Sequence, residues 1–140
     1  MSKNSITITL PKMKEINILT VAAGAGVSVQ FAEDVKNKKC SFDEKVVPDE
    51  TDYGVPINGE SMEPNYPDGC IVWVHETKNV KHGEVAIVTI NGAPFCKTYE
   101  EDGLHSYNPE FPTIHIEEGD NIDVLGKVIG YYVEEGSDDV

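Results

Sequence analysis

The sequence predicts one compact domain that is mostly β. Apolar runs are short, and Gly, Pro, Asn and Asp separate them about every 8 to 12 residues, a spacing typical of all-β domains. The dipeptide Asn91-Gly92 is the strongest hairpin signal in the chain. No stretch has helical periodicity over a normal helix length. With 140 residues, the chain can bury one core of ordinary size but not two independent ones.

The N-terminal part of the chain has the weakest strand pattern. Residues 6–10 alternate between apolar and polar side chains, but Pro11 and the charges after it end the alternation. We therefore expect residues 1–22 to form an extended arm or linker. A short strand is predicted around 27–31, and the rest of the run up to Pro48 reads as loop.

From Asp52 onward the strand pattern is tighter. Residues 60–68 contain two prolines and cannot form one regular element over their whole length. The expected strands are 55–58, 70–74, 84–90, 93–99, 103–106, 113–116 and 122–132. The main domain is expected to span 35–133, and the acidic tail 134–140 is expected to be frayed.

The charge of the chain argues against direct binding of nucleic acid. The formal net charge is −14, and all 11 cationic residues are lysines. Proteins that bind a nucleic-acid backbone use Lys and Arg to neutralise phosphates, and bidentate arginine is the commonest base-reading contact. The same charge disfavours docking on an anionic membrane. We therefore expect protein partners.

The cysteines and histidines have no disulfide or metal signature. Three cysteines, an odd number without C-x-x-C spacing, indicate reduced thiols in a cytoplasmic protein. The four histidines share no metal-ligand spacing, so we expect neither a metal nor a cofactor. No apolar run approaches the roughly 20 residues of a spanning helix, and charges interrupt the N-terminal stretch, so we expect a soluble protein that is not exported. These residues are Cys40, Cys70, Cys96, His75, His82, His105 and His115.

Ser61 and Lys97 are the candidate catalytic residues. A serine hydroxyl becomes a good nucleophile when a base takes its proton, and a lysine can be that base only if its amine is neutral near pH 7. The pKa of a free lysine is about 10.4, so burial among apolar groups would have to lower it by about three units. Ser61 lies between Gly59 and Pro64, in an irregular segment that can leave backbone N–H groups free to stabilise an oxyanion.

The surroundings predicted for Lys97 suit this demand. Alternation along strand 93–99 places it on one face with Phe95 and Tyr99. A two-residue loop at Asn91-Gly92 would pair Ile90 with Ala93, Val88 with Phe95 and Ala86 with Lys97. The charged amine is then disfavoured between two aromatic rings and opposite a small alanine. From the residues alone, an ordinary loop serine and a surface lysine with its amine in solvent remain the alternative.

Six blocks of the sequence, in order, resemble the catalytic domain of the LexA-type self-cleaving peptidases. That family includes LexA, phage repressors and the UmuD polymerase subunit, and the blocks read most like those of phage or mobile-element repressors. The blocks are 59–64 (Gly-Glu-Ser-Met-Glu-Pro), 67–72, 83–85, 95–97 (Phe-Cys-Lys), 106–111 and 124–130. The resemblance implies a compact β-barrel-type fold like that of signal peptidases. It also implies Ser61 as nucleophile, Lys97 as general base, and Met62 as part of the pocket with its N–H in the oxyanion hole.

The resemblance further implies cleavage of a bond in the protein's own chain, classically Ala-Gly. Two such bonds, Ala23-Gly24 and Ala25-Gly26, occur in the region 23–34. The sequence Val-Ala-Ala-Gly at 21–24 is closer to the family's cleavage sequence, so Ala23-Gly24 is the expected scissile bond and Ala25-Gly26 is the alternative.

Several roles are compatible with this resemblance. The first is the regulatory domain of a transcriptional repressor, which would dimerise through 124–132 and inactivate repression by cutting itself. Repressors of the family have a helix-turn-helix domain before the linker, and 22 residues precede Ala23 here, so we expect a C-terminal fragment. A stand-alone UmuD-like subunit for DNA-damage tolerance is the second, and a non-catalytic dimerisation module is the third. The implied partners are a second copy of the chain and either a RecA–DNA filament or an antirepressor protein.

Overall fold

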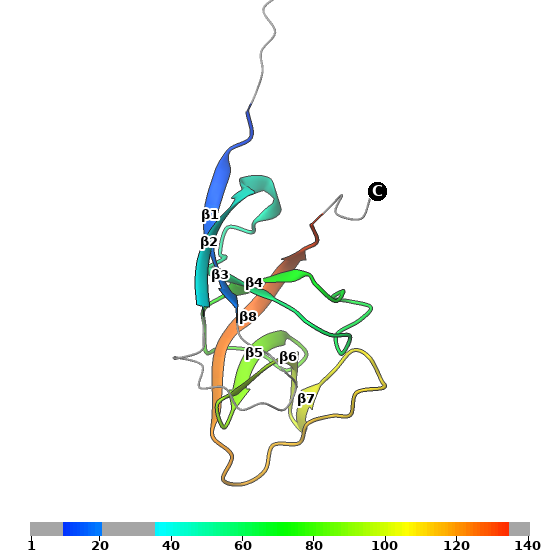
Figure 1. Cartoon of the computed structure of the whole chain (residues 1–140). Helices are drawn as coiled ribbons and strands as arrows, with labels where there is room; N and C mark the ends of the chain where they lie inside the picture. The colour runs from blue at the N-terminus through cyan, green and yellow to red at the C-terminus, as the bar shows by residue number, and fades with distance from the viewer. Residues whose placement is uncertain (1–9, 21–35, 135–140) are drawn as a thin grey trace, which may run out of the picture.

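The computed structural model describes residues 10–20 and 36–134, which form one eight-stranded sheet (Figure 1). The elements are β1 (Met13–Thr20), β2 (Lys36–Asp43), the 3₁₀ helix η1 (Glu44–Val46), β3 (Tyr53–Pro56), β4 (Ile71–His75), β5 (Val85–Ile90), β6 (Ala93–Glu100), β7 (Gly103–His105) and β8 (Ile122–Tyr132). The strand order is β2-β1-β3-β4-β8-β5-β6-β7. The predicted mostly β class is confirmed.

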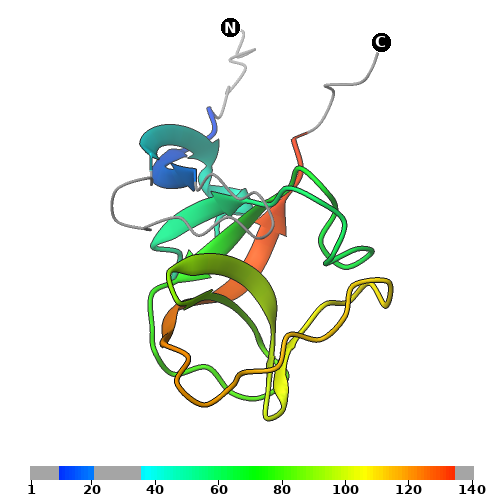
Figure 2. The same cartoon turned by 60° about the horizontal axis from the view of Figure 1, so that its bottom comes forward.

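The sheet is strongly curved, and Figure 2 shows the yellow-green ribbon of β6 bending round in an arc. In the described residues, β2 and β7 end the strand order without pairing with each other, so the sheet is open. The strand β8 crosses its centre and pairs with β4 through 127–132 and with β5 through 122–127. Within those residues, no helix is long and apolar enough to cross a membrane.

The predicted hairpin joins β5 to β6. Asn91 and Gly92 both have positive φ, at 51° and 86°, as a two-residue hairpin loop with the right-handed twist of the strands requires. The register pairs Ile90 with Ala93, Val88 with Phe95 and Ala86 with Lys97. This is the predicted register, so the face on which Lys97 lies is set by the turn.

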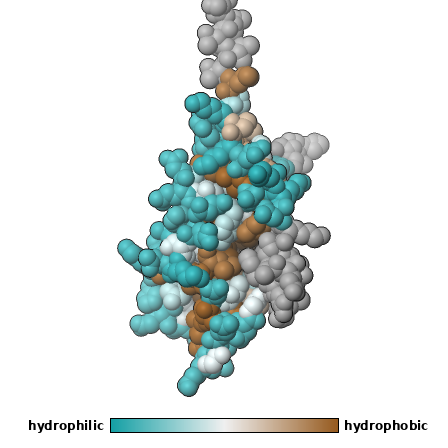
Figure 3. Space-filling view, turned by 90° about the vertical axis from the view of Figure 1, so that its left-hand side faces the viewer, coloured by the Kyte–Doolittle hydropathy of each residue, from teal (hydrophilic) through white to brown (hydrophobic). Residues whose placement is uncertain are grey.

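The prediction that the run up to Pro48 is loop was wrong for residues 36–43, which form β2. Strand β1, within the expected arm, was also not recognised as an element. The two strands pair antiparallel over their full length, from Met13 with Asp43 to Thr20 with Lys36. The sequence pattern did not reveal these strands because many of their side chains are polar. Strand β2 is an edge strand, and charged side chains are common on such edges. Figure 3 faces this side of the molecule, where hydrophilic side chains surround narrower apolar areas.

Of two further expected strands, one is shorter than predicted and the other lies outside the described residues. The strand expected at 113–116 is reduced to a single bridge, in which the amide groups of Leu104 and Ile114 exchange hydrogen bonds of 2.9 Å. Pro112, just before it, has no N–H with which to extend the pairing. The strand expected at 27–31 and most of the alternating segment 6–10 lie outside the described residues.

The core has three clusters of buried side chains. The first contains Val55, Ile57, Met62, Cys70, Val72, Val74, Val85, Ile87 and Val128; the second contains Ile16, Ile18, Val47 and Trp73; the third contains Ala86, Val88 and Leu104. Residues of β5 alternate between the first and third clusters, so this strand is covered on both faces. Its partner β6 is thereby held against a rigid support.

Gly103 is required where β7 meets the 113–116 segment. Its φ is +143°, and a Cβ there would clash with the carbonyl oxygen of Ile114. Gly103→Ala is therefore expected to lower the free energy of unfolding by about 2–5 kcal/mol, measured by urea denaturation. Gly119 is the matched control, because its φ is +93° but no atom lies within 4 Å of its added Cβ. Gly119→Ala is expected to cost about 1 kcal/mol, and equal losses in the two variants would contradict the proposed clash.

Candidate active site

A pocket of about 400 Å³ lies between the β3–β4 loop, strands β5 and β6, and the segment after β7. Ser61 and Lys97 both line it, as does Met62. The other lining residues are Val55, Pro56, Ile57, Asn58, Gly59, Glu60, Ile87, Pro94, Phe95, Cys96, Phe111, Pro112 and Ile114. The fold therefore brings the two candidate catalytic residues to one largely apolar cavity.

The loop that carries Ser61 is closed at its base and anchored in the core. The N–H of Ile57 donates to the carbonyl of Cys70 at 2.8 Å, and the N–H of Gly69 donates back to the carbonyl of Ile57 at 2.8 Å. Next to Ser61, the Met62 side chain is fully buried in the first core cluster. These contacts hold the half-buried Ser61 at the rim of the pocket.

Met62 follows Ser61 directly and lines the same pocket. Its side chain fills the floor beside the pocket, and among the described residues its N–H has no hydrogen-bond acceptor. A free N–H next to a nucleophile can serve as an oxyanion donor.

Lys97 is buried, with only 8% of its surface exposed. Burial lowers the pKa of its amine below the ordinary 10.5, while the nearby Cys96 thiol acts in the opposite direction. No carboxylate among the described residues forms an ion pair with it. The Lys97 Nζ lies 5.8 Å from the centroid of the Phe111 ring. The predicted burial of this lysine is therefore confirmed, but the aromatic ring recorded beside its amine is that of Phe111, not the expected Phe95 or Tyr99.

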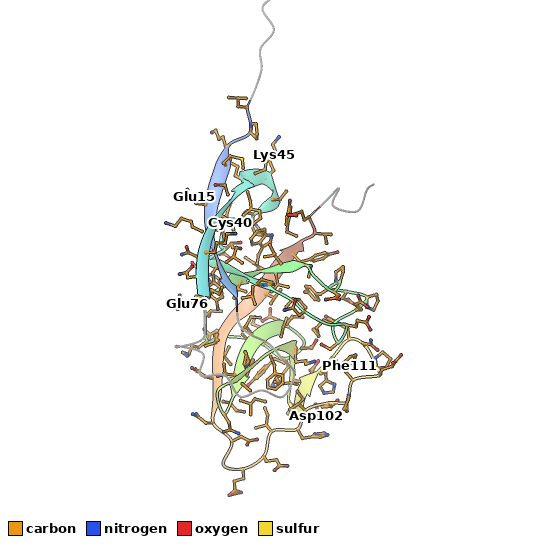
Figure 4. The ribbon with its side chains drawn as sticks, in the orientation of Figure 1. Glu15, Cys40, Lys45, Glu76, Asp102 and Phe111 are labelled. Carbon is orange, nitrogen blue, oxygen red and sulfur yellow. The ribbon has the colours of Figure 1, made fainter. Side chains whose placement is uncertain are left out.

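The hydrogen-bond partner of the Lys97 amine is the hydroxyl of Ser106, at 2.7 Å, rather than that of Ser61. Sequence reasoning gave Ser106 no role, although it begins one of the six blocks, 106–111. The same segment reaches the serine loop, because the N–H of Asn108 donates to the carbonyl of Ser61 at 2.9 Å. Figure 4 labels Phe111 on this segment, beside β7.

The cysteines and histidines of the described residues form neither a disulfide nor a metal-binding group. The three cysteines are free, and burial raises the pKa of the Cys96 thiol, which lines the pocket, to about 12. A thiol with such a pKa stays protonated and is a poor nucleophile. In the same described part of the chain, no group of His, Cys, Asp and Glu could hold a metal ion.

The two candidate scissile bonds, Ala23-Gly24 and Ala25-Gly26, lie outside the described residues. They belong to the connection between β1, which ends at Thr20, and β2, which begins at Lys36.

A small β domain with a serine and a buried lysine in one pocket has the arrangement of the serine–lysine peptidase class. The sequence model of the Peptidase S24-like family matches residues 17–129, and the chain belongs to this family.

Curated relatives of the chain are LexA repressors. It is 29% identical to the LexA repressor of Bacillus velezensis over 129 residues, which cover 89% of this chain and 63% of the relative. It is 31% identical to that of Oceanobacillus iheyensis over 111 residues, covering 77% and 54%. The match to that of Vibrio atlanticus is 31% over 87 residues, covering 58% and 42%. The chain thus spans about half the length of the curated relatives that it matches.

Proposed function

We propose that this chain is a self-cleaving serine endopeptidase domain, with Ser61 as nucleophile and Lys97 as general base. The observation that carries the proposal is the buried Lys97 amine, without a carboxylate partner among the described residues, in the pocket that Ser61 also lines. An ion-paired amine would keep its proton, whereas a desolvated one loses it more readily.

The reaction follows from these groups. The neutral amine of Lys97 takes the proton of the Ser61 hydroxyl as Oγ attacks the carbonyl carbon of the scissile bond. The N–H of Met62 donates to the oxyanion that forms. When the C–N bond breaks, Lys97 returns its proton to the departing amine, and an ester on Ser61 remains. Water, deprotonated by Lys97, then hydrolyses this ester and restores the serine.

The geometry of the sheet supports delivery of the chain's own segment to the pocket. Strand β1 pairs with β3 at Ile18 and Gly54, next to Val55, which lines the pocket. The connection that leaves β1 after Thr20 therefore starts close to the site. Its Ala23-Gly24 bond is the proposed substrate, with Ala25-Gly26 as the alternative. In the reactive state, Lys97 Nζ has to lie about 2.6–3.2 Å from Ser61 Oγ, and such contacts commonly tighten when substrate binds.

The proposed role is the regulatory part of a transcriptional repressor. The matched relatives are named LexA repressors, and this chain spans about half of their length. An acidic chain without arginine is unsuited to bind DNA itself, so its proposed part is self-cleavage and dimerisation. Strand β8 pairs with β4 through 127–132 and with β5 through 122–127, so each edge is paired over only part of its length, and Tyr131 is 47% exposed. The proposed dimer contact uses this strand, over residues 124–132.

The purified chain is expected to cut itself when the pH is raised, and mass spectrometry identifies the products. Cleavage at the preferred bond yields residues 1–23 and 24–140, and the alternative bond yields 1–25 and 26–140. The rate is expected to rise with pH through the pKa of Lys97, because only the neutral amine acts as base. Ser61→Ala is expected to abolish both products.

Ser41→Ala is the matched control, because Ser41 is an exposed serine on β2, away from the pocket. This variant should cleave like the unaltered chain. Products that still form in Ser61→Ala would refute the assigned nucleophile, and the absence of cleavage at every pH would favour a non-catalytic dimerisation module.

A further inference from the structure

The segment 106–111 contacts both halves of the proposed catalytic pair. Ser61 lies on the β3–β4 loop and Lys97 lies on β6, far apart in the sequence. Figures 1 and 2 both place the β3–β4 loop (green) beside the segment that follows β7 (yellow). This one segment forms hydrogen bonds with both Lys97 and Ser61.

The first contact is between Ser106 and the Lys97 amine. The Nζ donates to the Ser106 Oγ at 2.7 Å, in a partly buried setting. Strand β7 pairs with β6 so that His105 lies opposite Thr98, which brings Ser106 opposite Lys97 just beyond the end of the paired strands. The sheet register therefore places this hydroxyl, and the hydroxyl in turn limits the freedom of a long side chain with many rotamers.

The second contact is between Asn108 and the backbone of the serine loop. Its N–H donates to the carbonyl of Ser61 at 2.9 Å, and its Nδ2 donates to the carbonyl of Glu60 at 3.1 Å. The remaining side-chain oxygen accepts from the N–H of Glu110 at 3.0 Å. Asn108 thus holds two successive peptide groups at the nucleophile while its own conformation is fixed.

We infer that Ser106 and Asn108 are positioning residues, through which the segment 106–111 holds the base and the nucleophile of the proposed reaction at a set separation. This inference rests on the proposed function and deepens it. Ser106 acts on the amine and Asn108 acts on the serine backbone, so their loss has different signatures. Misplacement of a reacting group by about 1 Å can cost about 100-fold in rate.

The loss of Ser106 and the loss of Asn108 are expected to change the pH dependence of self-cleavage in different ways. A hydroxyl accepts a stronger hydrogen bond from an ammonium than from a neutral amine, so Ser106 favours the protonated form of Lys97. Ser106→Ala is therefore expected to shift the midpoint of the pH–rate profile to lower pH while it lowers the limiting rate at high pH about 10- to 100-fold. Asn108→Ala is expected to lower the limiting rate by a similar factor and leave the midpoint unchanged.

The test is the rate of self-cleavage of the full chain as a function of pH, with an NMR titration of the Lys97 ε-methylene as a second readout. Ser106→Thr keeps the hydroxyl and is expected to restore most of the rate and the midpoint. Asn65→Ala, an exposed asparagine on the same loop as Ser61, is expected to behave like the unaltered chain.

The outcomes distinguish the inference from the function on which it rests. If the unaltered chain cleaves and Ser61→Ala does not, but Ser106→Ala keeps both the rate and the midpoint, the inference is wrong and the proposed function stands. If Ser106→Ala loses rate but neither the midpoint nor the Lys97 titration shifts, Ser106 has only a structural role and the inference for it is wrong. An unaltered chain that never cleaves would remove the function and the inference together.

Discussion

Lys97→Met is expected to abolish self-cleavage at every pH and to stabilise the folded domain at pH values where the native lysine is charged. Methionine has a similar length and fills the same apolar space, but it cannot accept the proton of Ser61. A general base contributes about 10²- to 10⁴-fold to a rate, so the products should fall by at least that factor. Urea denaturation measures the stability, and mass spectrometry measures the cleavage.

The pH dependence of the stability gain follows from the lowered pKa of Lys97. Burial holds this pKa below the ordinary 10.5 in the folded state. Between the folded-state pKa and 10.5, the unfolded chain binds more protons, so the stability of the native protein rises with pH. Below the folded-state pKa, the native protein carries the full cost of burying the ammonium. The gain from Lys97→Met is therefore largest there and disappears above about pH 10.5.

Lys78→Met is the matched control for this effect. Its side chain is 76% exposed and pairs with Asp123 on the surface, so its removal should change stability only slightly. It should also leave cleavage unchanged. Residual cleavage in Lys97→Met, or a change of stability that is the same at pH 7 and above pH 10.5, would contradict the assignment of Lys97 as a buried base.

A cut within residues 21–35 is expected to leave the strand Met13–Thr20 bound in the sheet. Strand β1 lies between β2 and β3, and its eight residues pair in register with β2. The side chains of Ile16 and Ile18 are only 3% and 6% exposed and pack in the cluster of Trp73. Burial of each such isoleucine contributes about 1.5–3 kcal/mol. The cut alone removes none of these contacts.

This expectation can be tested without the proposed activity. A recognition site for an added protease is inserted between 21 and 35 in the Ser61→Ala chain, and the cut product is analysed by gel filtration. The two fragments should co-elute in native buffer and separate in urea. Ile18→Asp places a charge in the core beside Trp73 and should release the short fragment. Asn17→Asp, one residue away on the partly exposed opposite face, should not.

Separate elution of the two fragments from the chain with native Ile18 would contradict the expected retention. If the fragments stay together, cleavage converts an intramolecular contact into an intermolecular one, whose strength then depends on concentration. In the proposed repressor, separation of the two parts would thus need dissociation of β1 after the cut.

The elements that were predicted correctly have local signals. Asn91-Gly92 determines the β5–β6 hairpin because the loop length sets the register, and the register places Lys97 opposite Ala86. The strand expected at 122–132 has the bounds of β8. In contrast, β1 and β2 are rich in polar residues and have no clear local strand signal. They are stabilised by their pairing with each other and by packing against Trp73, which lies far away in the sequence.

The candidate site divides in the same way. The alternation around Lys97 predicted its burial, and the irregular, proline-containing segment predicted a loop at Ser61. The contacts of Ser106 and Asn108 were not predicted. Asn108 reaches Glu60 across 48 positions of the chain, and that distance is closed only by the course of the sheet.

The sequence by itself determined the mostly β class and the β5–β6 hairpin, because turn residues and alternating side chains act over a few positions. The choice of Ser61 and Lys97 for the proposed chemistry came from the resemblance of whole blocks to a known family. The tertiary structure alone decided that β1 is built into the sheet and that the segment 106–111 links Lys97 to the loop of Ser61. The physical reason is that hydrogen bonds between distant segments form only after sheet curvature has brought their donors and acceptors together, and no short sequence pattern encodes that approach.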